Sequence, residues 1–288
     1  ILAIGQTQPT QDYLGNAKRW YGAEVNRAER PKAKAALDAW ANLHTGGLIK
    51  ESAINVTPLT RLVVQNALLF AARWAKHFNA AATAERQPFT RADGSTSRAD
   101  LMSRTGHFTF VTGPGWRALR LPYVEGSGGS NKTTAGSSTL AMDIILPDDI
   151  GSPTDLPPTT WGEATRRLTA AQTAGTTTNV HLRLPRLNLS SKPTDLTGVV
   201  KSLGVRLGFQ DHIAPDLLVG QIVQQVKLVV AEAGTVAAAL TEIKIRTGAP
   251  PRPEEPIDFT VDHPYVLRIV DLTSGIALIE AAILDPAA

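Results

Sequence analysis

The sequence predicts a mixed α/β fold of the α+β type, in which helices and strands are largely segregated along the chain. Helical spacing of apolar residues dominates the first fifty positions, whereas stretches typical of strands follow one another from Phe89 onward. With 288 residues, 43% of them apolar, the chain can bury a sizeable core as one large domain or two small ones. It contains no cysteine, which excludes disulfide frameworks and thiolate metal sites.

Two helices are expected near the N-terminus. The first spans Thr10 to Tyr21, where apolar side chains share one face and Gly22 provides a stop. A short extended piece over 23–28 leads to the second helix, which follows Pro31 and ends at the Gly46–Gly47 pair. Its apolar residues at helical spacing are Ala35, Ala36, Ala39, Trp40 and Leu43.

A strand is expected from Arg61 to Phe70, RLVVQNALLF, because it is apolar on both faces, which is typical of a central strand covered on both sides. Gln65 and Asn66 interrupt it. A buried amide must be hydrogen-bonded, so these two side chains are either satisfied core amides or part of a polar cluster that clamps neighbouring strands.

The second half predicts three strands from 107 to 147 and a helix over 157–175. A strand pair that pivots on Pro185 comes next, and the chain closes with two strands joined by a turn at 271–275. Another helix is expected over Thr194 to Gly208, with a buried side formed by Leu196, Val199, Val200 and Leu203. The segment from Gly126 to Ser138 lacks the glycine that a phosphate loop needs before Lys132, since Asn131 stands there, and is interpreted as a hairpin linker.

The stretch Ala231 to Thr247, AEAGTVAAALTEIKIRT, combines a composition typical of a strand with flanks typical of a surface loop. From Thr235 to Ile245 one parity is uncharged, while Glu242, Lys244 and Arg246 all fall on the other. An alanine-rich helix from Val236 to Ile245 is the alternative, but β-branched residues at every second position favour a strand-competent loop. The proline-rich segment after it cannot enter a sheet interior, so the stretch reads as a surface excursion able to add a strand to a sheet.

EAGTVAAALT resembles the hinge of the reactive loop in inhibitory serpins, and other phrases resemble that family in the same order along the chain. These include Leu-Pro-Tyr at 121–123, Leu-Pro-Asp-Asp at 146–149 and Asp-His-Pro-Tyr at 262–265. The resemblance implies a single serpin domain over 1–288 with a large central β-sheet, a second β-sheet behind it, surrounding helices and a mobile reactive loop at about 232–256. It assigns the hinge to Glu232, Gly234, Thr235, Ala237, Ala238 and Ala239.

The same resemblance implies a suicide-substrate inhibitor of a serine protease, or of a cysteine protease by the same route. It places Asn66 and Gln224 in a shutter between the strands that admit the loop, and Trp74 in the breach where the loop enters. Thr235 is expected to stay in solvent until insertion begins. Counting from Gly234 places the cleaved bond at Gly248–Ala249, whereas Arg246–Thr247 would suit a trypsin-like protease.

Two departures from the family pattern stand out. The family's opening helices and the strand after the first of them have no counterpart, so either the missing portion is supplied otherwise or the fold is altered. The abrupt start with Ile-Leu-Ala-Ile leads us to expect that residues upstream have been lost or cut off. Gln224 stands where the family usually has a shutter histidine, and an amide cannot titrate.

Other functions find little support. The six histidines are dispersed with no His-x-x-x-His pair, and Gly-x-Ser-x-Gly is absent, so neither an enzyme nor a metal or other cofactor is expected. A net charge of +3 with scattered basic residues gives no nucleic-acid footprint, and no apolar run reaches membrane-spanning length. A monomer is expected, with extracellular location favoured over cytoplasmic. The rival interpretation is a non-inhibitory binding or structural protein with a serpin fold.

Overall fold

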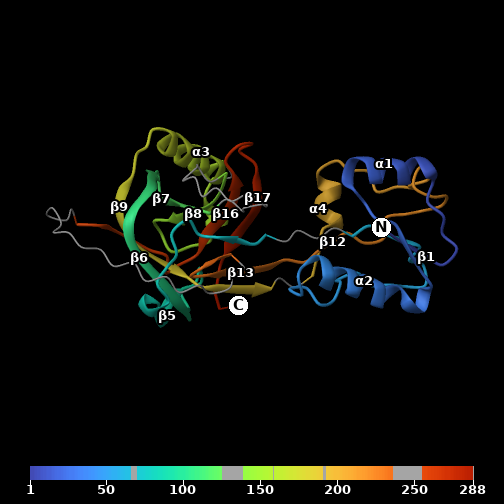
Figure 1. Cartoon of the computed structure of the whole chain (residues 1–288), viewed down its shortest axis with the longest axis horizontal. Coiled ribbons are helices and arrows are strands. Elements are labelled where there is room, and N and C mark those ends of the chain that lie inside the picture. Colours follow the sequence, from blue (N-terminus) through green and yellow to red (C-terminus); the bar gives the residue numbers. More distant parts are fainter. Residues whose placement is uncertain (66–69, 125–138, 158, 191–192, 236–254, 288) are drawn as a thin grey trace, which may run out of the picture. The chain divides into compact units, whose positions relative to one another are not determined.

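The structure is a computed structural model that describes residues 1–288 except 66–69, 125–138, 158, 191–192, 236–254 and 288. The chain divides into two compact units (Figure 1). Unit 1 comprises Ile1–Leu69 and Ser190–Lys227, and unit 2 comprises Phe70–Leu189 and Leu228–Ala288. Each unit is described by itself, and the single domain expected over 1–288 stays a prediction.

Unit 1 contains a three-stranded sheet in which β1 pairs with β2 in parallel and with β3 in antiparallel orientation. Helix α1 begins after Thr10, whose hydroxyl accepts a hydrogen bond from the Tyr13 amide, and it ends at Gly22 in the left-handed conformation. Both N-terminal helices are therefore confirmed. The elements of this unit are β1 (Leu2–Ile4), α1 (Gln11–Tyr21), β2 (Asn26–Ala28), α2 (Arg30–His44), β3 (Leu62–Val63), β11 (Thr194–Asp195), α4 (Thr197–Ser202) and β12 (Val223–Gln224).

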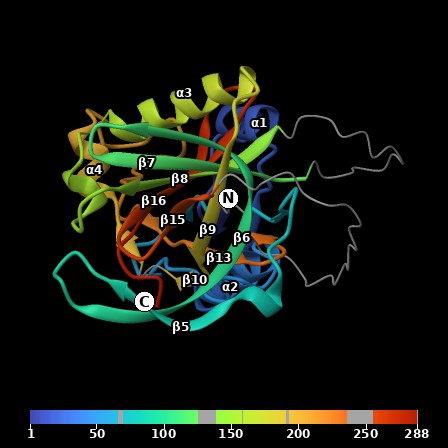
Figure 2. The same cartoon turned by 90° about the vertical axis from the view of Figure 1, so that its left-hand side faces the viewer.

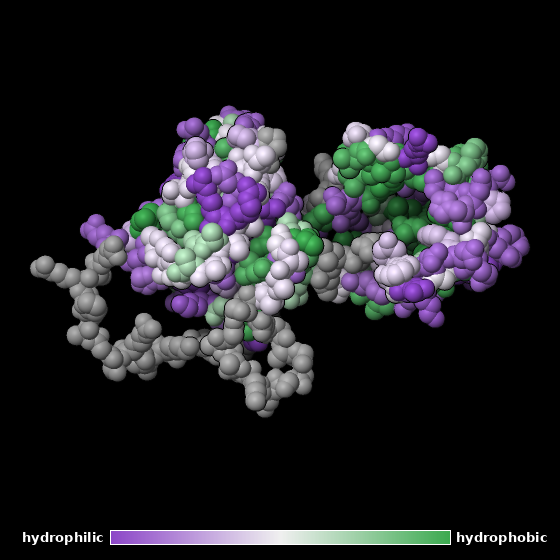
Figure 3. Space-filling model, turned by 90° about the horizontal axis from the view of Figure 1, so that it is seen from above, coloured by the Kyte–Doolittle hydropathy of each residue, from purple (hydrophilic) through white to green (hydrophobic). Residues whose placement is uncertain are grey.

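The core of unit 1 is small, and several large apolar side chains lie on its surface (Figure 3). Its fully buried cluster consists of Leu2, Ile4, Ala33, Leu37 and Val63. Two predictions are wrong here. The strand expected from Arg61 is limited to β3, with Val64 60% exposed, although 66–69 lie outside the described residues. The expected helix over 194–208 is only α4, which buries none of its residues.

Unit 2 is built on a large mixed sheet in the order β15-β9-β6-β7-β8-β16-β17, with β5 paired to β6 (Figure 2). The pairs are antiparallel except β15 with β9, which is parallel. Its strands are β5 (Ala84–Thr90), β6 (Thr96–Gly113), β7 (Trp116–Pro122), β8 (Leu140–Pro147), β9 (Thr178–Pro185), β15 (Ile257–Thr260), β16 (Tyr265–Asp271) and β17 (Ala277–Ile283). The strand-rich second half predicted from sequence is confirmed.

A second sheet and one helix cover the two faces of the large sheet. The second sheet has the order β10 (Leu187–Ser190), β13 (Lys227–Ala231), β14 (Gly234–Thr235), β4 (Ala72–Arg73). The main apolar cluster joins the sheets, since it contains Val230 of β13 together with Leu182 of β9 and Leu267 of β16. On the other face, α3 (Thr160–Thr173) packs through Ala164 and Leu168. Short 3₁₀ turns lie at Ala80–Ala82 and Pro153–Asp155.

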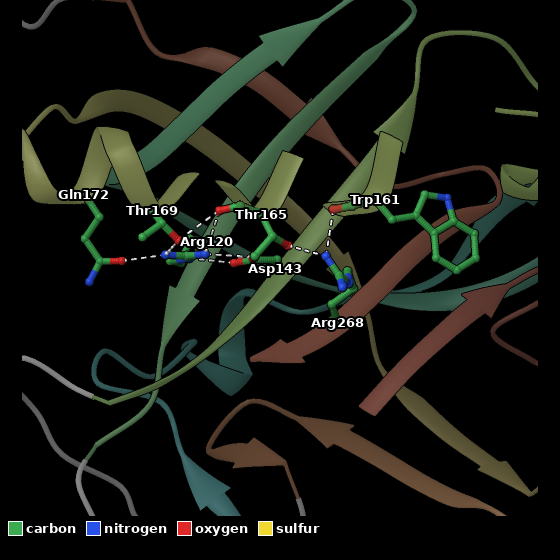
Figure 4. A network of polar contacts seen from close by, with 7 residues as sticks. All are labelled: Arg120, Asp143, Trp161, Thr165, Thr169, Gln172 and Arg268. Atoms are coloured by element: carbon green, nitrogen blue, oxygen red, sulfur yellow. Dashed lines mark hydrogen bonds and ion pairs between the residues drawn. The ribbon is translucent and has the colours of Figure 1, made fainter. Parts of the chain in front are cut away.

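Beneath α3 lies a buried ion pair between Arg120 of β7 and Asp143 of β8, whose side chains are 1% and 0% exposed (Figure 4). Two bonds join them: Arg120 Nε to Asp143 Oδ1 at 2.6 Å, and a second guanidinium nitrogen to Oδ2 at 2.8 Å. The remaining guanidinium nitrogen donates to Thr169 Oγ1 and Gln172 Oε1 of α3. Arg268 of β16 likewise donates to the Trp161 carbonyl and Thr165 Oγ1. Arginines of two strands thus fix α3 on the sheet.

Removing one member of this ion pair should cost far more than removing both. In Asp143→Leu the buried guanidinium loses its counter-charge, and we expect the free energy of unfolding to fall by about 3–5 kcal/mol. The double variant Arg120→Met/Asp143→Leu should recover most of that loss, because no unpaired charge remains. Urea denaturation of the three proteins, followed by near-ultraviolet circular dichroism, checks this. Equal losses in the single and double variants would contradict it.

A second buried charge site lies at the corner between β15 and β16. His263 is 7% exposed, and both ring nitrogens face acceptors: Nδ1 lies 2.9 Å from Asp262 Oδ1, and Nε2 lies 2.8 Å from the carbonyl oxygen of Pro147. Only the imidazolium can donate from both nitrogens at once. Burial alone would lower the pKa of His263, but the hydrogen bonds to Asp262 and Pro147 outweigh it and the pKa is raised from 6.5.

This geometry sets the sign of a pH dependence. Because the folded-state pKa of His263 is raised, its stabilisation is fully present below pH 6.5 and is lost as pH rises through the folded-state pKa. We therefore expect the free energy of unfolding to decline as pH is raised above 6.5, and His263→Gln to lose that component. Urea denaturation at a series of pH values measures it, with His107→Gln at an exposed position of β6 as the control. An unaltered pH profile in His263→Gln would refute the assignment.

Candidate functional site

The segment from Ala231 to Thr235 forms a tight turn that returns the chain into the second sheet. Strand β13 ends at Ala231, and β14 runs back antiparallel to it with Val230 opposite Thr235 and Ala231 opposite Gly234. On its other side β14 pairs with β4, with Gly234 opposite Arg73. The first residues after the turn therefore already occupy a place between two strands.

Gly234 is required at this position by space. Its φ is 152°, and a Cβ atom added there would lie 2.1 Å from the Ala72 carbonyl oxygen and 2.7 Å from the Arg73 Cα. Both contacts are with backbone, which cannot move aside as a flexible side chain could. No residue with a side chain fits without displacing β4.

Thr235 is 1% exposed, and its Oγ1 lies 2.8 Å from the Tyr123 hydroxyl. Burial raises the pKa of Tyr123, so the phenol stays protonated. The Tyr123 ring stacks on Trp74, with ring centroids 4.6 Å apart. Thr235 is therefore not exposed, as it was expected to be before insertion, because strand pairing and a buried hydroxyl partner hold it in the sheet.

Trp74 holds the turn through two hydrogen bonds, and its role at the loop entry stays a prediction. Its indole Nε1 donates to the Ala231 carbonyl at 2.8 Å, and its backbone amide donates to the Ala233 carbonyl at 3.0 Å. The Phe78 amide donates to the Glu232 carbonyl at 3.0 Å. The three consecutive carbonyls of the turn are thus satisfied by one short segment, 74–78, which is distant in sequence.

The Glu232 side chain is 14% exposed and is held by two donors. Its Oε1 accepts from Thr83 Oγ1 and from Arg186 Nε, each at 2.6 Å. Desolvation acts to raise the pKa of Glu232, but the hydrogen bonds from Arg186 and Thr83 outweigh it and the pKa is lowered. A carboxylate therefore ties the turn to the residue that follows β9 and to the residue that precedes β5.

Of the other predicted site residues, the described part of the chain contains Gln224 alone. Gln224 is exposed on β12, where it pairs with Thr194 of β11. Asn66 lies outside the described residues, so the shutter pair stays a prediction. The remaining hinge positions Ala237, Ala238 and Ala239 and the cleavage candidates Arg246, Thr247, Gly248 and Ala249 also lie outside them.

Sequence reasoning missed the partners that hold the turn. Tyr123 belongs to the Leu-Pro-Tyr phrase, which carried a family signal without a role for the hydroxyl. Thr83 and Arg186 lie 149 and 46 residues from Glu232, and no local pattern indicates either contact. Within the described ranges no group of three histidine or acidic side chains is placed to hold a metal ion. Among the helices described, none combines the length and apolarity needed to cross a membrane.

The fold is that of an α+β protein in which Gly234 and Thr235 form a short strand between β13 and β4 of the second sheet. The family model of serpins (serine protease inhibitors) matches residues 4–286, and the chain belongs to this family. An uncharacterized serpin-like protein of Thermococcus kodakarensis is 28% identical over 96% of this chain and 63% of its own length. The leukocyte elastase inhibitor of Bos taurus is 30% identical over 90% of this chain and 69% of its own length.

Solved structures agree on the fold. The native stressed form of Arabidopsis AtSerpin1 aligns with a TM-score of 0.72 at 22% identity, covering all of this chain and 75% of the other. Uncleaved ovalbumin aligns with a TM-score of 0.73 at 19% identity, covering 99% of this chain and 72% of the other. The chain spans 63–66% of the length of the Thermococcus relative and of a serpin-Z8 of Oryza sativa, which is 28% identical.

The buried contact between Thr235 and Tyr123 lends itself to a double-mutant cycle. Tyr123→Phe leaves the Thr235 hydroxyl without its partner and should lower the free energy of unfolding by about 1–3 kcal/mol, with a similar loss in Thr235→Val. In the double variant no polar group is left without a partner, so we expect its loss of unfolding free energy to be smaller than the sum of the losses in the two single variants. Urea titrations of the four proteins supply the coupling energy. Strict additivity would mean that the two hydroxyls do not interact.

Proposed function

We propose that this protein inhibits a serine protease as a suicide substrate and traps the acyl-enzyme by inserting its cleaved loop into the four-stranded sheet, in the role that the sequence assigned to the central sheet. The observation that carries the proposal is the place of β14. The first two loop residues after the turn lie between β13 and β4, so the continuing chain has a strand position to extend. Membership of the serpin family and the likeness to the bovine elastase inhibitor support it.

The mechanism needs no catalytic residue from this chain. The protease cleaves the loop and becomes acylated on its own nucleophile. The freed loop then extends β14 between β13 and β4 and carries the protease with it, so that its active site is distorted before water releases the ester. The uncleaved protein is accordingly metastable, because insertion buries apolar residues and completes a backbone ladder.

The side chains after Thr235 suit such a slot. Since alternate residues of a strand share a face, Ala237 and Ala239 follow Thr235 onto the inward face. Small uncharged residues there enter without leaving a buried charge. The family resemblance supports a shutter role for Asn66 and Gln224 in this mechanism.

The bond that the target protease cuts is either Gly248–Ala249, by counting from Gly234, or Arg246–Thr247, which suits a trypsin-like pocket. Arg252 is less suitable because Pro253 follows it, and proline after the bond resists such enzymes. Mass spectrometry of the fragments left by a panel of proteases identifies the bond. If trypsin-like enzymes do not cleave the loop, Arg246–Thr247 is excluded as the bond that the target protease cuts.

A matched pair of variants tests insertion directly. Ala237→Arg places a charge on the inward face, where burial without a partner costs several kcal/mol, so we expect cleavage without a surviving covalent complex. Ala238→Arg lies on the outward face and should keep the complex. A denaturing gel after incubation with the cleaving protease measures both, and thermal unfolding should shift upward on cleavage in the unmutated protein. No complex with any protease in the unmutated protein would favour a non-inhibitory binding role.

A further inference from the structure

The Ala233 carbonyl accepts two hydrogen bonds. One comes from the Trp74 amide at 3.0 Å, as part of the backbone contacts of the turn. The other partner is His77, whose Nδ1 lies 3.2 Å from the same oxygen. His77 is half-buried and stands between Trp74 and Phe78, the two residues whose amides hold the turn. The bond from His77 is therefore additional, because each of the three turn carbonyls already has another donor.

The partner atom determines what His77 must be. A carbonyl oxygen can only accept, so the hydrogen between them belongs to Nδ1. The neutral ring must then be the Nδ1–H tautomer, which is the minor one for a free imidazole, or else the ring is protonated and donates in the same way. Either form makes the contact, and the Nε2–H tautomer alone would set two acceptors against each other.

We propose that His77 is a positioning residue for the loop, which fixes the Ala233 carbonyl and thereby the direction in which the chain enters the sheet. The inference rests on the proposed inhibitory function for its consequence, although the contact itself does not. Ala233 is the last residue before Gly234, which has no side chain to pack and sits against the backbone of β4. The orientation of the turn is therefore set by the hydrogen bonds to its carbonyl groups and by the contacts of the Glu232 side chain. His77 is the side chain that donates to the Ala233 carbonyl.

Loss of this hydrogen bond should change the ratio between loop insertion and hydrolysis of the acyl-enzyme more than it changes the stability of the fold. The Trp74 and Phe78 amides keep the turn in place, so the strand pairs survive. Insertion, however, competes with hydrolysis of the acyl-enzyme. When the Ala233 carbonyl is held less firmly, insertion slows and a larger share of the acyl-enzyme is hydrolysed. His77→Leu should raise the number of inhibitor molecules consumed per protease inhibited by about fivefold, the ratio expected for one hydrogen bond. His77→Asn keeps a donor near the position of Nδ1 and should restore most of the lost inhibition.

Two measurements test the proposal. Nitrogen-15 correlation spectra of histidine-labelled protein, with His77→Leu to assign the signal, should show hydrogen on Nδ1, and an Nε2–H tautomer would overturn the contact. The stoichiometry of inhibition is compared among His77→Leu, His77→Asn and His107→Leu, where His107 is exposed on β6 and serves as the control. An unchanged stoichiometry in His77→Leu would overturn the positioning role. No inhibition by the unmutated protein would instead refute the proposed function while leaving the tautomer result intact.

Discussion

The structure depends on a strand of two residues. Strands β13 and β4 are joined through β14, because Gly234 and Thr235 pair with one neighbour on each side. The start of the loop is therefore part of the sheet rather than an appendage to it. Since Gly234 admits no side chain and Thr235 is fully buried, these positions serve the folded protein and the proposed insertion alike.

Two kinds of polar contact surround that strand and play different parts. The Arg120–Asp143 pair is fully buried and fully bonded, so it fixes α3 on the large sheet at one arrangement. The contacts of the turn are instead partly buried and are divided among short segments around 74–78, 83 and 186. The ion pair thus holds the helix on the large sheet, and the contacts of the turn hold the place where the proposed strand would begin.

Local patterns predicted the elements better than they predicted the site. Both N-terminal helices, the strands of unit 2 and the closing hairpin follow from spacing and turn residues, and Gly22 ends α1 as expected. The strand expected from Arg61 and the helix expected from Thr194 failed because both rested on apolar residues that unit 1 leaves exposed, such as Val64 and Leu203. Apolar spacing predicts which face can be buried, not whether another element covers it.

The site could be predicted only as far as its residues are contiguous. EAGTVAAALT identified Gly234 and Thr235, and the family phrases identified Trp74. The partners of Glu232 and Thr235 are the residues directly after β9 and β7 and directly before β5, so their contacts depend on tertiary structure that no local pattern encodes. The same distance explains why Thr235 was expected in solvent, since its burial depends on Tyr123.

Gly234 sets the register of this strand, and the proposed insertion would extend the strand in the same register. A slip by one residue would bring Thr235 to the place of Gly234, where its Cβ would meet the Ala72 carbonyl at 2.1 Å. It would also remove the Thr235 hydroxyl from Tyr123. Both penalties act at the entry, before any further loop residue pairs. In the proposed inserted strand every later residue would take its face from this one position, so the inward placement proposed for Ala237 and Ala239 depends on the fact that only glycine fits at 234.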